Sequence, residues 1–185
     1  MNETIKVIKG RRSIRKYKGK QIKDSDIQTI LDCAIHAPSA MNQQKWHFTV
    51  IQNKSMLNRM VDIIKENIIN SGIEFLIGKA SGDDYHTFYH APTVVLVTGD
   101  ENARLIDFDC GAAAQNIALA ARALNIGSCV MTSSGFLFAS EKGNQLKKEL
   151  GIPNGYKHVC AVSLGYQDED PVAPPKDKGV INYIK

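Results

Sequence analysis

The chain has 185 residues, with 23 lysines and arginines against 19 aspartates and glutamates, so its formal net charge is +4. This length fits one domain whose core needs no disulfide or metal. Hydrophobic residues make up 43% and charged residues 23% of the chain, which argues against a disordered, collagen-like or coiled-coil protein. We therefore expect a single domain over residues 1–185.

The first half of the chain is predicted to alternate helix and strand. Hydrophobic periodicity predicts a short helix over 4–9 and a second over 24–35, where Ser25 and Gln28 have the spacing of a capping box. A strand led by aromatic residues follows at 46–51. These segments provide one strand and two helices of the expected domain.

The middle of the chain contains one segment without a pattern. A helix capped by Ser55 is predicted to extend to Ile68. Residues 71–90 hold three glycines, two histidines and several aromatic residues with no clean period, so we expect a lid or an excursion that contacts a partner. Residues 92–98 form a continuous apolar run, which predicts a strand covered on both faces.

The second half is predicted to complete an α+β domain. Residues 109–124 form a helix that is apolar nearly all round and therefore buried, at the centre of the domain or of a dimer. A strand at 128–132, an exposed helix at 141–150 and a strand at 158–164 follow. The extension 166–185 is rich in proline and charge, and its apolar end predicts a final docked strand. The sum is about four strands and five helices.

Cysteine use and hydropathy indicate the compartment. The four cysteines are widely spaced, with no C-x-x-C pair and no metal-ligand pattern, so we expect reduced thiols in the core. Charged residues interrupt the start of the chain, which lacks a signal-peptide pattern, and no apolar run is long enough to span a bilayer. The sequence predicts a cytoplasmic protein without a membrane partner.

Several motifs for catalysis or metal binding are missing. There is no G-x-G-x-x-G fingerprint, no complete P-loop and no G-x-S-x-G elbow. His86 and His90 have the i, i+4 spacing of two ligands on a helix, but no third ligand is evident near them. We therefore predict no metal site.

The basic side chains are concentrated at one end of the chain. Residues 1–23 contain nine lysines and arginines and one acid, Glu3, so this segment carries +8 and the rest of the chain −4. Residues 11–17 place three arginines and a serine within five positions, which suits a phosphate. A solvated basic face or a nucleic-acid-binding arm explains this segment equally well.

A second polar segment favours the phosphate. Residues 37–48 form a loop rich in small and amide side chains, which suits the hydrogen-bonding edge of a planar heterocycle. With both segments the sequence resembles the FMN-dependent nitroreductase family, in its short-chain branch. The resemblance covers nearly the whole chain, in the order Arg-Arg-Ser-Ile-Arg-Lys-Tyr, Ala-Pro-Ser-Ala-Met-Asn-Gln-Gln-x-Trp-x-Phe, Asp-x-Gly-Ala-Ala-x-Gln-Asn, Leu-Asn-Ile-Gly-Ser-Cys and Ser-Leu-Gly-Tyr.

The resemblance implies a nitroreductase-like fold and a homodimer. That fold has a mostly antiparallel central sheet of about four to five strands flanked by helices, with a long buried helix at the dimer core. Two FMN sites would lie at the subunit interface, with Arg15 near the flavin N1/O2 edge. Lys45 departs from the family, in which a proline is common at this position, and would add charge beside the site.

The resemblance also assigns residues to the flavin. They fall into three groups: on the phosphate and ribityl side, Arg11, Arg12, Ser13, Arg15, Lys176 and Lys178; from the loop of the other chain, Pro38, Ser39, Ala40, Asn42 and Gln44; and near N5, Ser133, Ser134 and Gly135.

The activity that the resemblance implies takes place on the flavin. NADH or NADPH would deliver hydride to N5, and a small electron-poor acceptor such as a nitroaromatic or quinone would take the electrons. No side chain is required as a nucleophile. Dehalogenation, reduction of an enone or peroxide, and flavin breakdown are alternatives with the same cofactor. A flavin-binding protein without turnover and a nucleic-acid-binding module also stay open, although we expect no nucleic-acid partner.

Overall fold

The computed structural model describes residues 1–185 as six α-helices, two 3₁₀ helices and one four-stranded sheet. The strand order is β1-β2-β4-β3, and every neighbouring pair is antiparallel. This confirms the predicted α+β class and the antiparallel sheet. The strands are β1 (Trp46–Ile51), β2 (Thr93–Asp100), β3 (Gly127–Met131) and β4 (Tyr156–Gly165).

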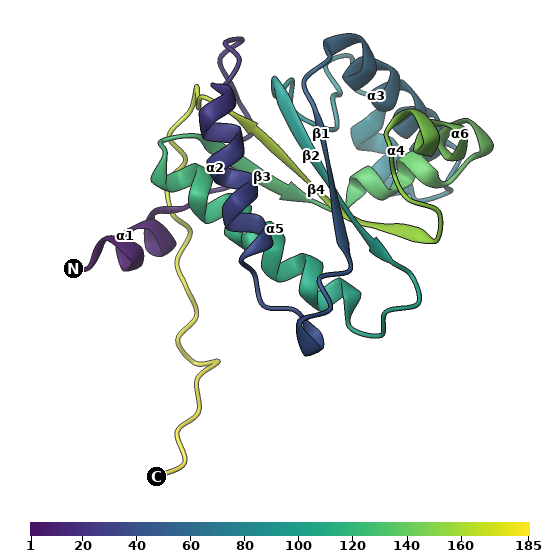
Figure 1. Cartoon of the computed structure of the whole chain (residues 1–185). Helices are drawn as coiled ribbons and strands as arrows, with labels where there is room; N and C mark the ends of the chain where they lie inside the picture. Colours follow the sequence, from purple (N-terminus) through teal and green to yellow (C-terminus); the bar gives the residue numbers. More distant parts are fainter.

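Helices cover both faces of this sheet (Figure 1). None of them is both long and apolar enough to cross a membrane. On one face lie α2 (Asp24–Ile35) and α5 (Ile106–Ala123), with α1 (Glu3–Gly10) beside α5. On the other face lie α3 (Lys54–Ile69), α4 (Glu74–Ala80), the 3₁₀ helix η2 (Ser133–Phe138) and α6 (Glu141–Glu149). A second 3₁₀ helix, η1 (Ala40–Asn42), precedes β1.

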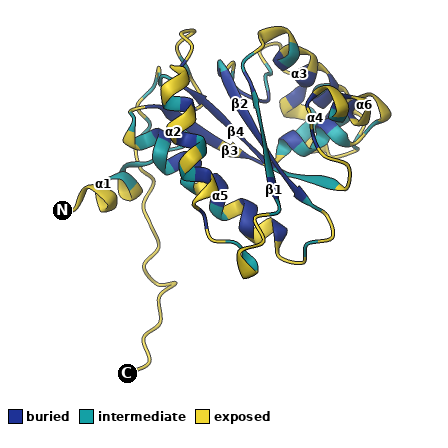
Figure 2. Ribbon diagram, in the orientation of Figure 1, coloured by how far each residue is buried: buried dark blue, intermediate teal, exposed yellow.

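The central strand β2 shows why the domain has two layers of helices. Val95 and Val97 join the core under α2 and α5, whereas Val94 and Leu96 join the core under α3, η2 and α6. Successive side chains of a strand point to opposite faces, so a continuous apolar run needs cover on both. Figure 2 shows β2 as a buried strand in the centre of the domain, as predicted from its apolar run.

The basic segment after α1 is held at the free edge of β3. The Ile14 backbone N–H donates to Ser128 O at 2.9 Å, and the Ile14 side chain is buried. Gly127 of β3 pairs with Gly165 of β4. A Cβ atom at Gly127 would lie 3.0 Å from Ile14, and one at Gly165 would lie 2.9 Å from Tyr17. The two facing glycines therefore leave the room that this segment needs at the sheet edge.

Two predicted helix caps are wrong. Helix α2 begins after Lys23, which makes no side-chain cap, and Ser25 lies inside the first turn, so the capping box does not form. Helix α3 is capped by Asn53, whose side-chain oxygen accepts a backbone N–H of the first turn, and Ser55 follows inside the helix. In both cases the N-cap lies two residues before the serine. Several neighbouring residues are able to begin each helix, so the sequence does not single out the one that does.

The end of the chain does not form the predicted final strand. Residues 180–184 have no regular structure and extend away from the domain (Figure 1), and Ile184 is almost fully exposed. A strand needs a free sheet edge, and the β3 edge is taken by the basic segment, which pairs at Ser13 with Ser128. The apolar end therefore cannot pair with β3, and it does not pair with the other edge strand, β1, whose only strand partner is β2.

Helix α5 is buried on one side only. Cys110 and Ala113 face the sheet, but Phe108 is 74% exposed, and Gly111 and Gln115 are also exposed. The prediction of a helix buried all round is therefore wrong for the single chain. The uncovered face carries apolar and small residues, so the dimer core remains a prediction that this surface supports.

The four cysteines are unpaired, as predicted. Cys110, Cys129 and Cys160 are buried, and Cys33 is half-buried. Burial raises the pKa of Cys110 to about 12 and that of Cys160 to about 11. These thiols stay protonated at neutral pH and act as small core side chains, not as nucleophiles.

Replacing Gly165 with alanine is expected to lower the free energy of unfolding by roughly 1–3 kcal/mol, the usual cost of overpacking. The added Cβ would lie 2.7 Å from Pro92 Cδ and 2.9 Å from Tyr17 Cδ1. Urea denaturation measures the change. The control is Gly78→Ala in α4, where no atom lies within 4 Å of the Cβ position, and it should be neutral or stabilise by up to about 1 kcal/mol. Equal losses in the two variants would contradict the close approach at the sheet edge.

Candidate functional site

The backbone of the basic segment is fixed on both sides. One side contacts β3, and on the other the Glu169 carboxylate accepts hydrogen bonds from the backbone N–H groups of Arg15 and Lys16, the latter at 3.2 Å. The Asp168 N–H donates to Lys16 O at 2.9 Å. Residues that follow β4 thus complete the support, and the arginine side chains project from a rigid base.

A cavity of about 760 Å³ lies between the basic segment and residues 71–90. This volume is within the range of small-molecule and cofactor sites. The cavity combines cationic and aromatic side chains, which suits a planar ligand with acceptor groups at its edge. Its walls include Arg15 and Tyr17 of the basic segment, Ser133 after β3, and Lys79, Tyr85 and Tyr89 of the 71–90 segment.

Arg15 is a permanent cation in this cavity. Its Cζ atom lies 5.8 Å from the centre of the Tyr89 ring, within the range of a cation–π contact. Hydrogen bonding to the Tyr89 side chain is the main reason that the pKa of Arg15 is raised above its usual value. The cavity therefore presents a fixed positive charge to any ligand that it binds.

Two loops hold residues in a strained backbone conformation. Tyr89 and His90 have φ values of 54° and 55°, and Met41, Asn42 and Gln44 have values of 50°, 55° and 51°. The left-handed region costs a non-glycine residue roughly 1–3 kcal/mol, and such residues are concentrated at binding and catalytic sites. One strained loop lines the large cavity, and the other is the loop over residues 38–44 that the sequence assigned to the flavin.

His86 organises the loop at the cavity. Its Nδ1 accepts the backbone N–H groups of Phe88 and His90, each at 3.2 Å. Burial and the His90 ring, whose centre lies 4.1 Å away, lower the pKa of His86 to about 4. The ring is therefore neutral at pH 7, and its Nδ1 is already used. The chain contains no group of three His, Cys, Asp or Glu side chains that could hold a metal ion.

A second cavity, of about 200 Å³, lies beside the start of the basic segment. Arg11, Arg12 and Arg122 line it. Arg12 is partly used, because its Nη1 donates to Lys9 O and Arg11 O at 2.7 Å. Arg11 and Arg122 remain available for an anion, for which guanidinium groups give bidentate contact.

The loop over residues 38–44 is anchored to the start of α5. The Ala40 N–H donates to both carboxylate oxygens of Asp109, at 3.1 and 3.2 Å, and Asp109 is 96% buried. Within the loop, Gln44 N donates to Ser39 Oγ and Gln44 Nε2 donates to Asn42 Oδ1, both at 3.0 Å. These bonds hold the loop in its strained conformation with its amide groups exposed.

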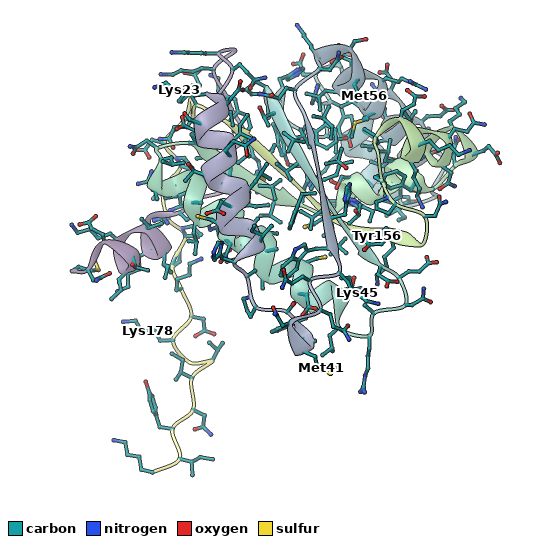
Figure 3. The ribbon with its side chains drawn as sticks, viewed as in Figure 1. Lys23, Met41, Lys45, Met56, Tyr156 and Lys178 are labelled. Atoms are coloured by element: carbon teal, nitrogen blue, oxygen red, sulfur yellow. The ribbon has the colours of Figure 1, made fainter.

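The two predicted parts of the flavin site do not meet in one chain. The loop is held by Asp109 near the start of α5, whereas Arg122 near its end lines the small cavity with Arg11. Thirteen residues of α-helix span about 20 Å. Figure 3 shows Met41 at the outer tip of this loop. The separation supports the prediction that the loop, with Pro38, serves the partner's site, which no contact within one chain can test.

Other assigned residues also lie away from the cavities. Lys178 lies on the extended tail (Figure 3), and Lys176 is likewise exposed there, so neither reaches the basic segment of its own chain. Ser133 lines the large cavity, whereas Ser134 is fully buried and Gly135 is half-buried, and neither lines this cavity. Lys176 and Lys178 would reach a phosphate beside the basic segment only if the tail took another conformation or served another chain.

Lys45 does not add an unbalanced charge beside the loop. Its Nζ lies 2.8 Å from Asp100 Oδ2. This ion pair raises the pKa of Lys45 and lowers that of Asp100. Asp100, at the end of β2, thus neutralises the lysine that stands where the family commonly has a proline. The expectation that Lys45 adds charge beside the site is therefore wrong.

Several residues of the site were missed by the sequence reading. Tyr85 and Tyr89 line the large cavity, Arg122 lines the small one, and Asp109 anchors the loop. Two features of the sequence pointed to them: the many aromatic residues within 71–90, and Arg122 as a single arginine in an otherwise apolar helix. Neither signal indicates which distant segment the residue faces.

The geometry defines an α+β domain with a positively charged cavity where the basic segment lies along the sheet edge. The polar loop over residues 38–44 lies at the start of α5, far from the small cavity beside the end of that helix. The sequence model of the Nitroreductase family matches residues 8–166. The chain belongs to the nitroreductase family.

Known proteins agree with this assignment. A protein from Archaeoglobus fulgidus, provisionally named NADH dehydrogenase/NAD(P)H nitroreductase, is 35% identical over 92% of this chain and 88% of its own length. The 4-nitrobenzoate reductase of a Nocardioides species is 30% identical over 90% of this chain and 82% of its own. The crystal structure of a Bacteroides fragilis nitroreductase with bound FMN covers 100% of both chains, with a TM-score of 0.93 and 33% identity. The predicted family and fold are confirmed.

Replacing Asp109 with alanine is expected to lower the free energy of unfolding by about 1.5–3 kcal/mol, the value of hydrogen bonds to a charged group. The variant leaves the Ala40 N–H without its acceptor. Urea denaturation measures the loss. The matched control is Asp107→Ala on the same helix, which removes an exposed ion pair with Lys157 and should cost less than about 1 kcal/mol. An equal or larger loss in the control would show that Asp109 does not anchor the loop.

Proposed function

We propose that this protein is an NAD(P)H-dependent oxidoreductase that binds FMN and passes hydride through flavin N5 to an electron-poor acceptor. The observation that carries the proposal is the 760 Å³ cavity, in which Arg15, Ser133 and Tyr89 meet in a member of the nitroreductase family. The FMN bound in the B. fragilis nitroreductase supports the choice of cofactor. The provisional name of the A. fulgidus relative supports NADH or NADPH as the electron donor.

The residues present fit the two ends of FMN. The small cavity offers Arg11 and Arg122 to a phosphate, for which planar guanidinium groups are well suited. The large cavity offers two tyrosine rings and the Arg15 guanidinium to a flat, polar-edged ring system. Ser13, between these cavities, pairs with Ser128 on the strand edge. The donors thus follow one another along a single extended segment, as an elongated ligand requires.

The protein's part in the reaction is electrostatic and steric. When bound, FMN supplies hydride transfer at N5, so no side chain has to act as a nucleophile. Arg15 would stabilise the negative charge that reduction brings to the N1/O2 edge, because a cation already oriented toward the developing charge needs no reorganisation during the reaction. Ser133 adds a hydroxyl to the wall of the same cavity. The neutral His86 shapes the loop and adds no competing charge at pH 7.

The complete site is proposed to form in a homodimer. The loop with Asn42 and Gln44 lies about 20 Å along α5 from the small cavity of its own chain. The uncovered face of α5 exposes Phe108 and Leu105, which are 74% and 50% exposed. Packing these faces would cover the apolar side chains and bring each loop toward the other chain's cavity. A cytoplasmic location is part of the same proposal.

The proposed acceptor is a small electron-poor aromatic molecule, such as a nitroaromatic or quinone. The name of the Nocardioides relative, 4-nitrobenzoate reductase, supports this class. The tyrosines of the large cavity suit stacking with such a ring. Dehalogenation, reduction of an enone or peroxide, and flavin breakdown would use the same cofactor and would be distinguished by product analysis.

The purified protein is expected to bind FMN and to consume NADH or NADPH in the presence of a quinone or a nitroaromatic. The test is to reconstitute it with FMN, remove free flavin, record the absorbance of the bound flavin, and follow steady-state nucleotide oxidation. Free FMN at the same concentration is the control for the non-enzymatic rate. Absence of bound flavin would refute the cofactor, and bound flavin without turnover would leave a binding protein.

Arg11→Ala and Arg15→Ala are each expected to weaken FMN binding by roughly 10- to 100-fold. Each loses a charge-assisted hydrogen bond worth about 1.5–3 kcal/mol. Equilibrium titration of the apoprotein with FMN measures the dissociation constant. Lys18→Ala removes the same charge from an exposed position of the segment and should retain nearly wild-type affinity. If all three variants bind FMN equally well, the phosphate and ring sites lie elsewhere.

A further inference from the structure

A buried hydrogen-bond chain lies behind Ser133, at the wall of the large cavity. His158 Nε2 on β4 lies 2.8 Å from Ser134 Oγ, and this hydroxyl lies 3.3 Å from Met131 O at the end of β3. Ser134 is fully buried. The chain therefore ties β4, η2 and the end of β3 together through one imidazole ring and one hydroxyl.

A β-bulge directs His158 to this position. Val97 pairs with Cys160 and Thr98 with His158, so Val159 is the extra residue in β4. Val159 and Cys160 both pack toward α5. Without the bulge, strand alternation would place His158 on the α5 face; with it, the ring lies on the η2 face.

The imidazole packs directly against η2. The centre of its ring lies 5.7 Å from that of Phe138, at the end of the 3₁₀ helix. A Cβ atom at Gly135 would lie 3.4 Å from His158 Cδ2. Ring contact and hydrogen bond together define where the first residues of η2 lie.

The protonation of His158 follows from its surroundings. Its Nδ1 is buried and has no hydrogen-bond partner, and an unpaired buried N–H is rarer than an unpaired acceptor. The proton is therefore assigned to Nε2, which donates to Ser134 Oγ, while the Ser134 hydroxyl donates to Met131 O. Burial lowers the pKa of His158 to about 4, so the ring is neutral at pH 7 and keeps one fixed donor.

We propose that His158 is a positioning residue for the flavin, which fixes the η2 turn so that Ser133 is presented to the cavity at a set distance from N5. The inference rests on the proposed function, because it takes the turn over residues 133–135 to face the flavin. An apolar ring or chain could fill the same space without leaving a nitrogen unpaired. The hydrogen bond to Ser134 is therefore the feature that His158 contributes and that an apolar residue could not replace.

The test compares three variants in the FMN-loaded protein. His158→Gln keeps an N–H donor near the Nε2 position, His158→Leu fills the space without one, and Ser134→Ala removes the acceptor. The readouts are bound FMN content, the midpoint potential of the bound FMN and the rate of its reduction by NADH. We expect His158→Leu and Ser134→Ala to keep FMN, shift the potential, and lose roughly 10- to 100-fold in reduction rate, the cost of a small misplacement of reacting groups. His158→Gln should restore most of the rate.

A double variant and a spectrum of the free imidazole complete the test. His158→Leu combined with Ser134→Ala should be no slower than either single variant, because both remove the same bond. Nitrogen-15 NMR of the wild-type apoprotein should show His158 as the Nε2–H tautomer at pH 7. This spectrum needs no flavin, so it separates failure of the inference from failure of FMN binding.

Defined results would overturn the inference. A wild-type rate and potential in His158→Leu, equal impairment in His158→Gln and His158→Leu, or an Nδ1–H tautomer would each do so. If His158→Leu does not fold, Ser134→Ala provides the same comparison with a smaller change in volume. A wild-type rate and potential in Ser134→Ala would then exclude the positioning role.

Discussion

The packing of the basic segment against the edge of β3 is the contact on which the rest of the site depends. It requires two facing glycines, Gly127 and Gly165, because any side chain there would occupy the space of Ile14 or Tyr17. Once the segment is seated, Arg11 faces the small cavity and Arg15 the large one. The same contact closes the β3 edge of the sheet to the apolar end of the chain. One steric allowance thus determines where the cations are presented and keeps the tail from pairing with β3.

Each strained loop is held by one side-chain acceptor of backbone N–H groups. His86 Nδ1 does this beside the large cavity, and the Asp109 carboxylate does it for the loop before β1. Five left-handed non-glycine residues would otherwise relax, since each costs roughly 1–3 kcal/mol. Polar side chains thus fix the shape of two loops, of which the one over residues 38–44 lies at the start of α5. The uncovered face of this helix is the surface through which that loop could reach the cavity of a second chain.

The sequence predicts the layers of this fold well and the site only in part. The apolar run of β2 indicates cover on both faces, because successive side chains of any strand point to opposite faces of the sheet. The extra residue Val159 breaks this rule without changing the hydrophobic pattern, so the face of His158 was not predictable. The predicted strand at the end of the chain does not form, because strand pairing depends on contact with a distant sheet edge, which the local apolar pattern does not reveal. Arg15 and Ser133, which the family resemblance assigns to the flavin, line one cavity. No local pattern indicates this proximity, since it arises from a contact between distant segments.

Three groups in the cavity wall and behind it keep a constant charge near neutral pH. Burial lowers the pKa of His86 and His158 to about 4, so both rings are neutral, and the Arg15 guanidinium is always charged. These three groups therefore present the same charges to a bound ligand across the neutral pH range. The protons that accompany electron transfer would then be exchanged with the nucleotide, the acceptor and water, while the protein maintains geometry and charge.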